Sequence, residues 1–189
     1  MSTEHRALII IDMQQGMLPS VTPARNNPTA EEHIARLLAH WRRFGWPIVH
    51  VKHRSSSPLS PFWPHQSGFE FQAAFEPQPH ELVIEKKVPD AFLLTHLPQW
   101  LRERAIDQLI LVGVSTNISV ESSARTASNL GFKVSVVSDA TFAFDRTDYR
   151  GCYRYANDVH FMSLGNLAGE FADIVTTEAL CSSLSNCSC

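Results

Sequence analysis

Three reactive side chains each stand where a predicted strand ends or where the following helix begins. Asp12 closes an apolar run near the N-terminus, Lys86 closes a later run, and Ser119 lies between a turn and a predicted helix. Each has an ordinary structural explanation: an aspartate often caps a helix, a lysine is often a solvated charge, and a serine at a helix start is often an N-cap. Together the three supply a proton acceptor, a cation and a nucleophile position.

The elements that must position these residues alternate along the chain. The strand candidates are continuous apolar runs, which indicates burial on both faces and therefore a parallel sheet between two layers of helices. The sequence thus predicts an α/β fold of three layers with six parallel strands, of Rossmann-like type. We expect strands at 7–12, 47–51, 81–86, 108–114, 133–140 and 173–177, and helices within 29–45, 94–105, 120–131 and 157–172.

Local signals set the limits of the first helix. Thr29 and Glu32 form the capping-box pattern at its start, and Gly45 predicts its end. The apolar residues between them recur on one helical face, which predicts packing against the sheet.

Ligands of open α/β sheets bind beyond the carboxyl ends of the strands. The positions to consider are therefore Asp12, the loop after Val51, Lys86, the turn 113–119 and Asp139. The long segment 53–80 carries several aromatic residues and is unusually long for a connection, so we expect it to be functional. Its aromatic residues fit either a substrate pocket or a hydrophobic cluster beneath the loop.

Composition and charge exclude several classes of protein. The chain has 189 residues and a net charge of -3, which gives no electrostatic reason to expect nucleic acid. No apolar run is long enough to span a bilayer, and no signal peptide is evident, so we expect no membrane association and a cytoplasmic location. We expect one domain over 1–180 and a mobile Ser- and Cys-rich tail over 181–189, with no disulfide framework.

The sequence also resembles a known family over about residues 6–178. The stretches "ALIIIDMQQGM", "VIEKKVPDAFLLTHL", "LILVGVSTNISVESSARTASNLGFKVSVVSDAT" and "DVHFMSLGNLAGEFADIVTT" are similar to motifs of the isochorismatase-like hydrolases, also called cysteine hydrolases. The four motifs occur in the family's order and spacing. The resemblance implies a six-stranded parallel sheet flanked by helices, in agreement with the pattern of the residues.

The resemblance implies a catalytic triad of Asp, Lys and Cys. Asp12 matches the first member, and Lys86 matches the second because it precedes the Asp90-Ala91-Phe92 trio by four residues. The third falls on Ser119, where amidase members of the family have cysteine. The resemblance further implies a cis peptide between Val114 and Ser115, which would aim the N–H groups of Ser115 and Ser119 at a developing oxyanion.

The departure at Ser119 leaves several interpretations open. The chain could be an amidohydrolase whose nucleophilic Cys is replaced, which would make it slow or inactive, or a natural serine-containing member with altered activity. It could instead be an isochorismatase-type vinyl-ether hydrolase that uses the aspartate as proton donor, or a binding protein of the same fold without catalysis. We favour the first, an amidohydrolase acting on a small amide, carbamoyl or ureide compound.

The remaining expectations concern the pocket and the assembly. Nicotinamidases in the superfamily hold a metal through Asp-x-His and a further His, whereas this chain has His53 without the aspartate, so we expect no metal and no cofactor. The family commonly forms oligomers, which implies a homodimer or homotetramer. Gln14 would orient Asp12 or lie in a solvated turn. The candidate pocket residues are Gln14, Arg54, Phe62, Trp63 and Asn117.

Overall fold

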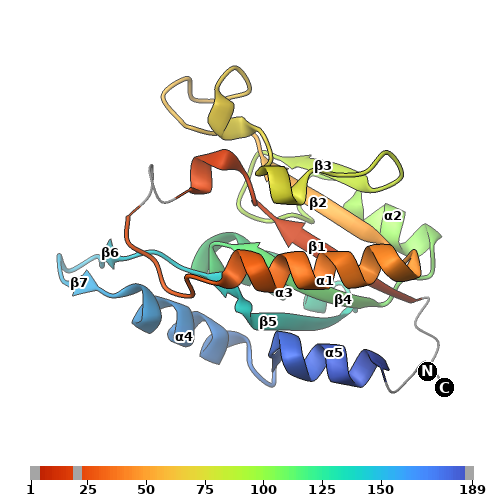
Figure 1. Cartoon of the computed structure of the whole chain (residues 1–189). Coiled ribbons are helices and arrows are strands. Elements are labelled where there is room, and N and C mark those ends of the chain that lie inside the picture. Colours follow the sequence, from red (N-terminus) through yellow and green to blue (C-terminus); the bar gives the residue numbers. More distant parts are fainter. Residues whose placement is uncertain (1–4, 19–22, 186–189) are drawn as a thin grey trace.

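The computed structural model describes residues 5–18 and 23–185 and contains the predicted parallel sheet. Its six strands lie in the order β3-β2-β1-β4-β5-β8, and every neighbouring pair is parallel (Figure 1). The expected α/β fold is therefore confirmed. The strands are β1 (Arg6–Ile11), β2 (Ile48–His53), β3 (Leu82–Lys86), β4 (Gln108–Val114), β5 (Lys133–Phe142) and β8 (Asp173–Val175).

Helices cover both faces of this sheet. One face packs against α1 (Ala30–Phe44) and α5 (Thr177–Ser185). The other packs against α2 (Leu97–Glu103), α3 (Glu121–Asn129) and α4 (Ala156–Leu167). Each face has its own apolar cluster, which is why the central strands read as continuous apolar runs.

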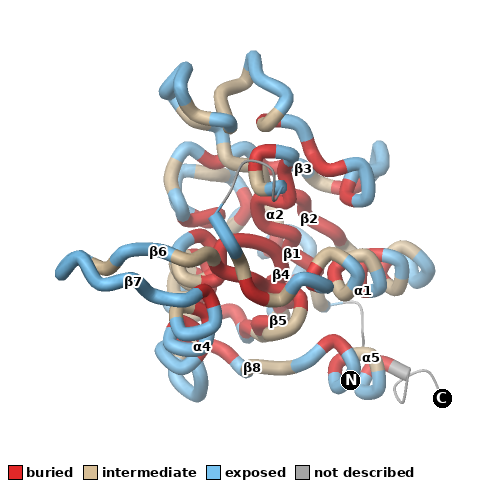
Figure 2. Tube along the Cα trace, turned by 60° about the vertical axis from the view of Figure 1, so that its left-hand side comes forward, coloured by how far each residue is buried: buried red, intermediate tan, exposed pale blue. Residues whose placement is uncertain are grey.

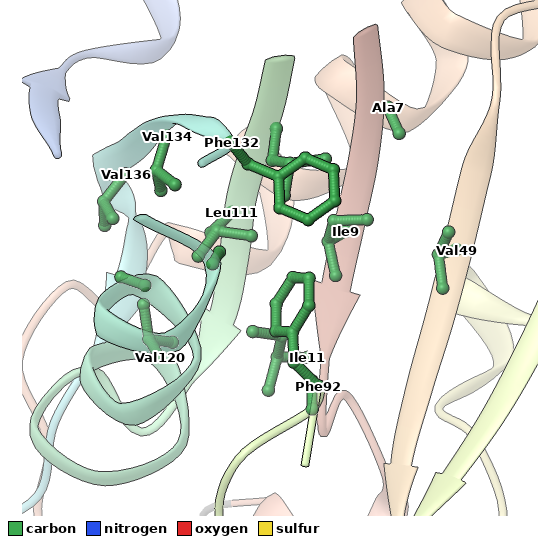
Figure 3. Packing of buried hydrophobic residues seen from close by; sticks show 14 of the residues in the cluster. Ala7, Ile9, Ile11, Val49, Phe92, Leu111, Val120, Phe132, Val134 and Val136 are labelled. Atoms are coloured by element: carbon green, nitrogen blue, oxygen red, sulfur yellow. The ribbon is translucent and has the colours of Figure 1, made fainter. Parts of the chain in front are cut away.

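The strand β1 illustrates this burial on two sides. Leu8 and Ile10 belong to the cluster beneath α1 and α5, whereas Ile9 and Ile11 belong to the opposite cluster. Figure 3 shows the second cluster, in which Phe92 lies close to Ile11. Strand β1 is thus fixed from both faces, which holds the chain immediately after it in a defined place.

The first helix keeps its predicted limits, but its start is built differently. Thr29 is the N-cap, yet its side chain makes no capping hydrogen bond, so the predicted capping box does not form. Instead the Glu32 N–H donates to the Thr29 carbonyl at 3.0 Å. Gly45 ends the helix with φ of 66°, the left-handed conformation that glycine adopts readily.

The structure corrects two predictions in the C-terminal half of the chain, the end of strand β5 and the start of the tail. Strand β5 continues to Phe142, so Asp139 does not end it; Asp139 instead accepts hydrogen bonds from Thr177 at the start of α5. The expected tail from 181 is helical as far as Ser185, because Leu184 is buried in the cluster beneath α1. The remainder of that tail, 186–189, lies outside the described residues.

A short hairpin follows β5 and was not predicted. It consists of β6 (Arg146–Thr147) and β7 (Tyr153–Arg154), which pair antiparallel. Figure 2 shows it as an exposed projection beside the N-terminal part of α4.

The long segment after β2 is held against the rest of the fold. It contains two short 3₁₀ turns, Ser67–Phe69 and Ala73–Phe75, and it buries Phe69, Phe71 and Phe75. Phe71 also forms a bridge with Gln14 in the turn after β1. These three aromatic residues therefore pack beneath the loop, as the hydrophobic-cluster interpretation of this segment predicted.

Within residues 5–18 and 23–185, no helix combines the length and the apolar character that a membrane span requires.

Glu81 forms a buried polar cluster at the start of β3. Its carboxylate accepts hydrogen bonds from Arg42 at 2.7 and 2.9 Å and from the Gln78 N–H at 2.8 Å, and it lies 2.8 Å from His50 Nε2. Burial raises the pKa of Glu81, but the bonds to Arg42, Gln78 and His50 outweigh burial and lower the pKa from its ordinary 4.5 to about 2. The cluster ties α1 to the sheet through this carboxylate.

Replacing Glu81 with glutamine is expected to lower the free energy of unfolding at pH 7 by on the order of 3 kcal/mol. A carboxylate with a depressed folded-state pKa stabilises the fold fully above its unfolded-state pKa, and this stabilisation is lost as pH falls from about 4.5 toward 2. Urea denaturation at pH 7 and at pH 3 should therefore show a smaller difference between the two proteins at pH 3. Glu170→Gln, at an exposed residue, is the matched control, and an equal loss at both pH values would contradict the argument.

Candidate active site

The fold brings the three predicted reactive residues together at the carboxyl edge of the sheet. Asp12 directly follows β1, Lys86 is the last residue of β3, and Ser119 lies in the turn after β4. Strands β1 and β4 are direct neighbours, while β2 separates β1 from β3. The long side chain of Lys86 must therefore reach past the end of β2 to meet the other two.

The three side chains are in direct contact. Asp12 Oδ2 lies 2.7 Å from Lys86 Nζ and accepts a hydrogen bond from Ser119 Oγ at 2.8 Å. The Lys86 ammonium in turn donates to Ser119 Oγ at 3.3 Å. Asp12 and Lys86 are each 1% exposed and Ser119 is 7% exposed, so both charges lie in the interior. The second carboxylate oxygen of Asp12, Oδ1, is also buried and has no hydrogen-bond partner among the described residues.

The turn that carries Ser119 has an unusual backbone. The Val114–Ser115 peptide bond is cis, at the position that the resemblance implied. Residues Thr116–Val120 then form a single π-helical turn, in which the Val120 N–H donates to the Ser115 carbonyl at 3.1 Å. The turn continues directly into α3, so Ser119 lies two residues before the first residue of that helix.

Ser123 fixes this turn against the segment after Lys86 and was not singled out from the sequence. Its hydroxyl donates to the Ser119 carbonyl at 2.6 Å and accepts from the Ala91 N–H at 3.0 Å. Asp90 holds the same segment by accepting from the Phe92 N–H at 2.7 Å. The spacing of one helical turn between Ser119 and Ser123 was the available sequence signal.

His160 supports the opposite side of the turn and was also missed. Its Nδ1 lies 2.8 Å from the Thr116 hydroxyl, and the ring is almost wholly buried. Burial is the main effect on the pKa of His160 and lowers it to about 4, against a hydrogen bond with the Ser138 backbone. The ring is therefore neutral at neutral pH, so it joins α4 to the nucleophile turn without adding charge.

Gln14 is buried, which corrects the expectation that it might lie in a solvated turn. Its amide nitrogen donates to the carbonyls of His53 and Phe69 at 3.1 and 2.9 Å, and its oxygen accepts from the His53 N–H at 2.8 Å. Through these hydrogen bonds, the Gln14 side chain connects the ends of β1 and β2 to the long loop. Gln14 thus supports the backbone around Asp12 rather than meeting its carboxylate.

His53 lies beside the buried charges of Asp12 and Lys86, whereas the sequence analysis considered it only as a metal ligand and expected no metal. It pairs in register with Lys86 across β2 and β3, and its ring meets Phe62 edge-on at 5.9 Å between centroids. Burial lowers the pKa of His53, the Lys86 ammonium lowers it further, and the Asp12 carboxylate acts in the opposite direction. His53 is therefore a neutral, half-buried wall of the site at neutral pH.

Arg54, Trp63 and Asn117, three of the other candidate pocket residues, border hollows at the surface. Arg54 and Trp63 border one of about 300 Å³ together with Lys87, but the Arg54 guanidinium is already paired with Glu85 at 2.9 Å. Asn117 borders another of about 200 Å³, which also includes Ser115. No three His, Cys, Asp or Glu side chains within 5–18 and 23–185 gather into a group that could hold a metal ion.

The fold and site define a class of α/β protein with a buried aspartate, lysine and nucleophile position at the carboxyl edge of a parallel sheet. Residues 6–179 match the model of the isochorismatase domain. The chain therefore belongs to the isochorismatase family, whose members are hydrolases.

Several known proteins are similar over most of the chain. The isochorismatase family protein YrdC of Bacillus subtilis is 37% identical, covering 94% of this chain and 95% of its own. A crystal structure of an isochorismatase-family protein from Chromobacterium violaceum is 42% identical, with a TM-score of 0.93, covering 98% of this chain and 96% of that one. Nicotinamidase 3 of Arabidopsis thaliana is 29% identical over 94% of this chain and 88% of its own length. A streptothricin hydrolase of Streptomyces noursei is 29% identical, but the match spans only half of that protein.

Proposed function

We propose that this chain is an amidohydrolase of small linear amides, carbamoyl compounds or ureides, with the nucleophile position at 119. The observation that carries the proposal is the shared contact of Asp12 Oδ2 with both Lys86 Nζ and Ser119 Oγ. A buried ion pair contributes little net stability, so a functional reason for keeping it is expected. The relatives named as a nicotinamidase and a streptothricin hydrolase add support for C–N bond cleavage.

The arrangement suits acyl transfer in two steps. The nucleophile at 119 attacks the amide carbonyl while its proton passes to Asp12, and the N–H groups of Ser115 and Ser119 receive the developing negative charge. As the C–N bond breaks, Asp12 returns the proton to the leaving nitrogen, which departs as ammonia or an amine. Water then attacks the acyl group and gives a proton to Asp12. Asp12 passes this proton to the nucleophile as the bond between the acyl carbon and the nucleophile breaks, so the acid leaves with the nucleophile and the carboxylate restored.

Lys86 and the free oxygen of Asp12 have separate roles in this scheme. The Lys86 ammonium lies 2.7 Å from Asp12 Oδ2, where it pairs with the carboxylate and steadies the developing charge on the nucleophile. Asp12 Oδ1 is buried and has no partner among the described residues, so it is the oxygen that we assign to accept a hydrogen from the amide nitrogen or from the incoming water. The carboxylate can thus serve both steps without moving.

Serine at 119 makes the proposed reaction slow. A thiol has a pKa near 8.5 and is readily lowered by a helix N-terminus and a nearby ammonium, whereas a hydroxyl is far less acidic. Ser119 therefore stands where the amidases of the family that the chain resembles use cysteine, and we infer that it replaces such a cysteine. The cytosolic location and the homodimeric or homotetrameric assembly stay predictions.

Screening the Ser119→Cys protein against a library of small amides tests the proposal. Ammonia release from at least one linear amide is expected, at a rate several orders of magnitude above that of the Ser119 protein. In the Ser119 protein, Ser122→Cys adds a thiol three residues after Ser119, within α3, and should leave the low activity unchanged. Absence of ammonia from every amide would favour the vinyl-ether hydrolase or the non-catalytic alternative instead.

A further inference from the structure

The ring of His53 differs from the two fully buried histidine rings of this fold in its hydrogen bonds. His50 Nε2 lies 2.8 Å from the Glu81 carboxylate, and His160 Nδ1 lies 2.8 Å from the Thr116 hydroxyl. Neither ring nitrogen of His53 has a hydrogen-bond partner within the described part of the chain. Because polar groups in a protein interior are normally hydrogen-bonded, the half-buried His53 ring has capacity for a molecule that enters the site.

Strand geometry places the His53 ring on the side of the sheet that carries the reactive residues. Successive side chains of a strand alternate between its faces, and Val51, two residues before His53, belongs to the cluster beneath α2, α3 and α4. Ile84, two residues before Lys86, belongs to the same cluster. His53 and Lys86 also pair in register across β2 and β3. Their side chains therefore lie next to each other on the face that α3 covers, and α3 follows directly from the turn that carries Ser119.

The position of the ring is fixed by the backbone and by an aromatic neighbour. The Gln14 side chain accepts from the His53 N–H at 2.8 Å and donates to the His53 carbonyl at 3.1 Å, which ties the end of β2 to the turn after β1. The Phe62 ring meets the His53 ring edge-on at 5.9 Å between centroids. Phe62 also packs closely on the turn after β1, since a Cβ added at Gly16 would lie 2.7 Å from Phe62 Cε1. His53 is thus held in place before any substrate binds, with apolar surface against its ring.

The second step of the proposed reaction requires a water molecule that is held at both of its hydrogens. Asp12 Oδ1 is buried without a partner among the described residues and is assigned to accept one of them. Lys86 cannot accept the other, because an ammonium group only donates hydrogen bonds. Burial and the Lys86 ammonium both lower the pKa of His53, so its ring is neutral at neutral pH. A neutral imidazole has one nitrogen that accepts a hydrogen bond.

We propose that His53 is a further catalytic residue, whose unprotonated ring nitrogen holds the water that hydrolyses the acyl intermediate. This inference rests on the two-step acyl transfer proposed above. The water oxygen bonds to the acyl carbon as the bond from that carbon to the nucleophile breaks. One hydrogen of the water passes through Asp12 to the nucleophile, and the other, which His53 holds during the attack, stays on the hydroxyl of the released acid. The first step uses no water and therefore does not depend on His53.

Reaction of the Ser119→Cys protein with 4-nitrophenyl acetate tests the proposal, because release of nitrophenolate reports the first step as a burst and the second step as the steady rate. Adding His53→Phe keeps a planar ring beside Phe62 but removes the acceptor. It should lower the steady rate by about 10- to 100-fold, the usual effect of leaving a buried hydrogen-bonding group without its partner. The rate of the burst should change only a few-fold. His53→Gln, which retains an acceptor oxygen, should lower the steady rate less.

Two further measurements identify the step that is slowed. Peptide mapping by mass spectrometry should find the acetyl group accumulated on the introduced thiol of the His53→Phe protein. Hydroxylamine, which attacks a thioester without help from a base, should restore turnover of that protein. The Ser119 protein gives the background from the other nucleophiles of the chain. His96→Phe, at an exposed histidine just before α2, is the matched control and should change neither phase.

The outcomes separate this inference from the amidase proposal. Equal slowing of the burst and the steady rate, or no slowing of the steady rate, would overturn the role of His53 and leave the amidase function standing in a protein that releases ammonia from an amide. A His53→Phe protein without an acetyl group on the introduced thiol would also overturn that role. Slowing of the steady rate alone, in a protein that releases ammonia from no amide, would support the role of His53 and overturn only the proposed function.

Discussion

Replacing Asp12 with asparagine in the Ser119→Cys protein is expected to lower kcat/KM for amide hydrolysis by about 10²- to 10⁴-fold. Asparagine keeps the shape of the side chain but cannot take a proton from the nucleophile. Asp12 Oδ2 is the atom within 2.8 Å of the nucleophile's oxygen, and the neighbouring cation, Lys86, has no proton-accepting capacity while charged. Steady-state assays of ammonia release with a saturable amide measure the loss.

Stability measurements on the same variants separate catalysis from folding. Asp12→Asn leaves the Lys86 ammonium buried without its charge partner, and removing one member of such a pair commonly costs about 3–5 kcal/mol. Replacing both residues, by Asp12→Asn with Lys86→Met, removes both charges and should destabilise less than the sum of the two single changes. Activity should stay low in all three proteins, because two of them lack the Asp12 base and Lys86→Met removes the cation that lies 2.7 Å from it.

Asp173→Asn provides the matched control, since Asp173 is exposed at the start of the edge strand β8. It should alter neither activity nor stability appreciably. A folded Asp12→Asn protein that retained most of the activity would contradict the role of this carboxylate and move the proton transfer to another group. His53 would be the next candidate, because its ring is neutral and lies beside the same charges.

The sequence predicts the sheet and the three contacting side chains for one physical reason. Strands that are buried on both faces read as continuous apolar runs, and parallel strands bring the residues that follow them to one edge. Asp12, Lys86 and Ser119 each mark such an end, so their convergence follows from topology once the strands are recognised. The distances of 2.7 to 3.3 Å between these side chains could not be predicted, because they depend on side-chain packing and not on the periodicity of apolar residues.

The residues that were missed depend on features with weak local signals. Strand β6 has two residues, too few for an alternating pattern, so the hairpin after β5 could not be predicted from the sequence. Strand β5 runs three residues beyond Asp139 because its pairing with β4 shifts register between Leu111 and Gly113. Helix α5 was missed because its sequence has few charged residues and is rich in serine, as a mobile tail is. Its buried leucines nevertheless pack on the sheet.

Replacing Gly113 with alanine is expected to lower the free energy of unfolding by on the order of 3 kcal/mol or more, and the protein is expected to be recovered in low yield. Gly113 pairs with Ile11 across β4 and β1, and an added Cβ would lie 2.1 Å from the Ile11 carbonyl oxygen, far inside contact distance. Its φ of +114° is also a conformation that residues with side chains rarely adopt. Chemical denaturation and the yield of soluble protein measure the effect.

Gly165→Ala in α4 is the matched control, because a Cβ there meets no atom within 4 Å and φ is ordinary. It should raise stability by about 0.5–1 kcal/mol, the usual gain on replacing a helical glycine. The close approach at Gly113 also sets the distance between Asp12, which follows Ile11, and the turn that carries Ser119. Any Gly113→Ala protein that folds must therefore separate β1 from β4, and in the Ser119→Cys background it should lose amidase activity. Full activity at wild-type stability would show that this strand contact does not position the carboxylate.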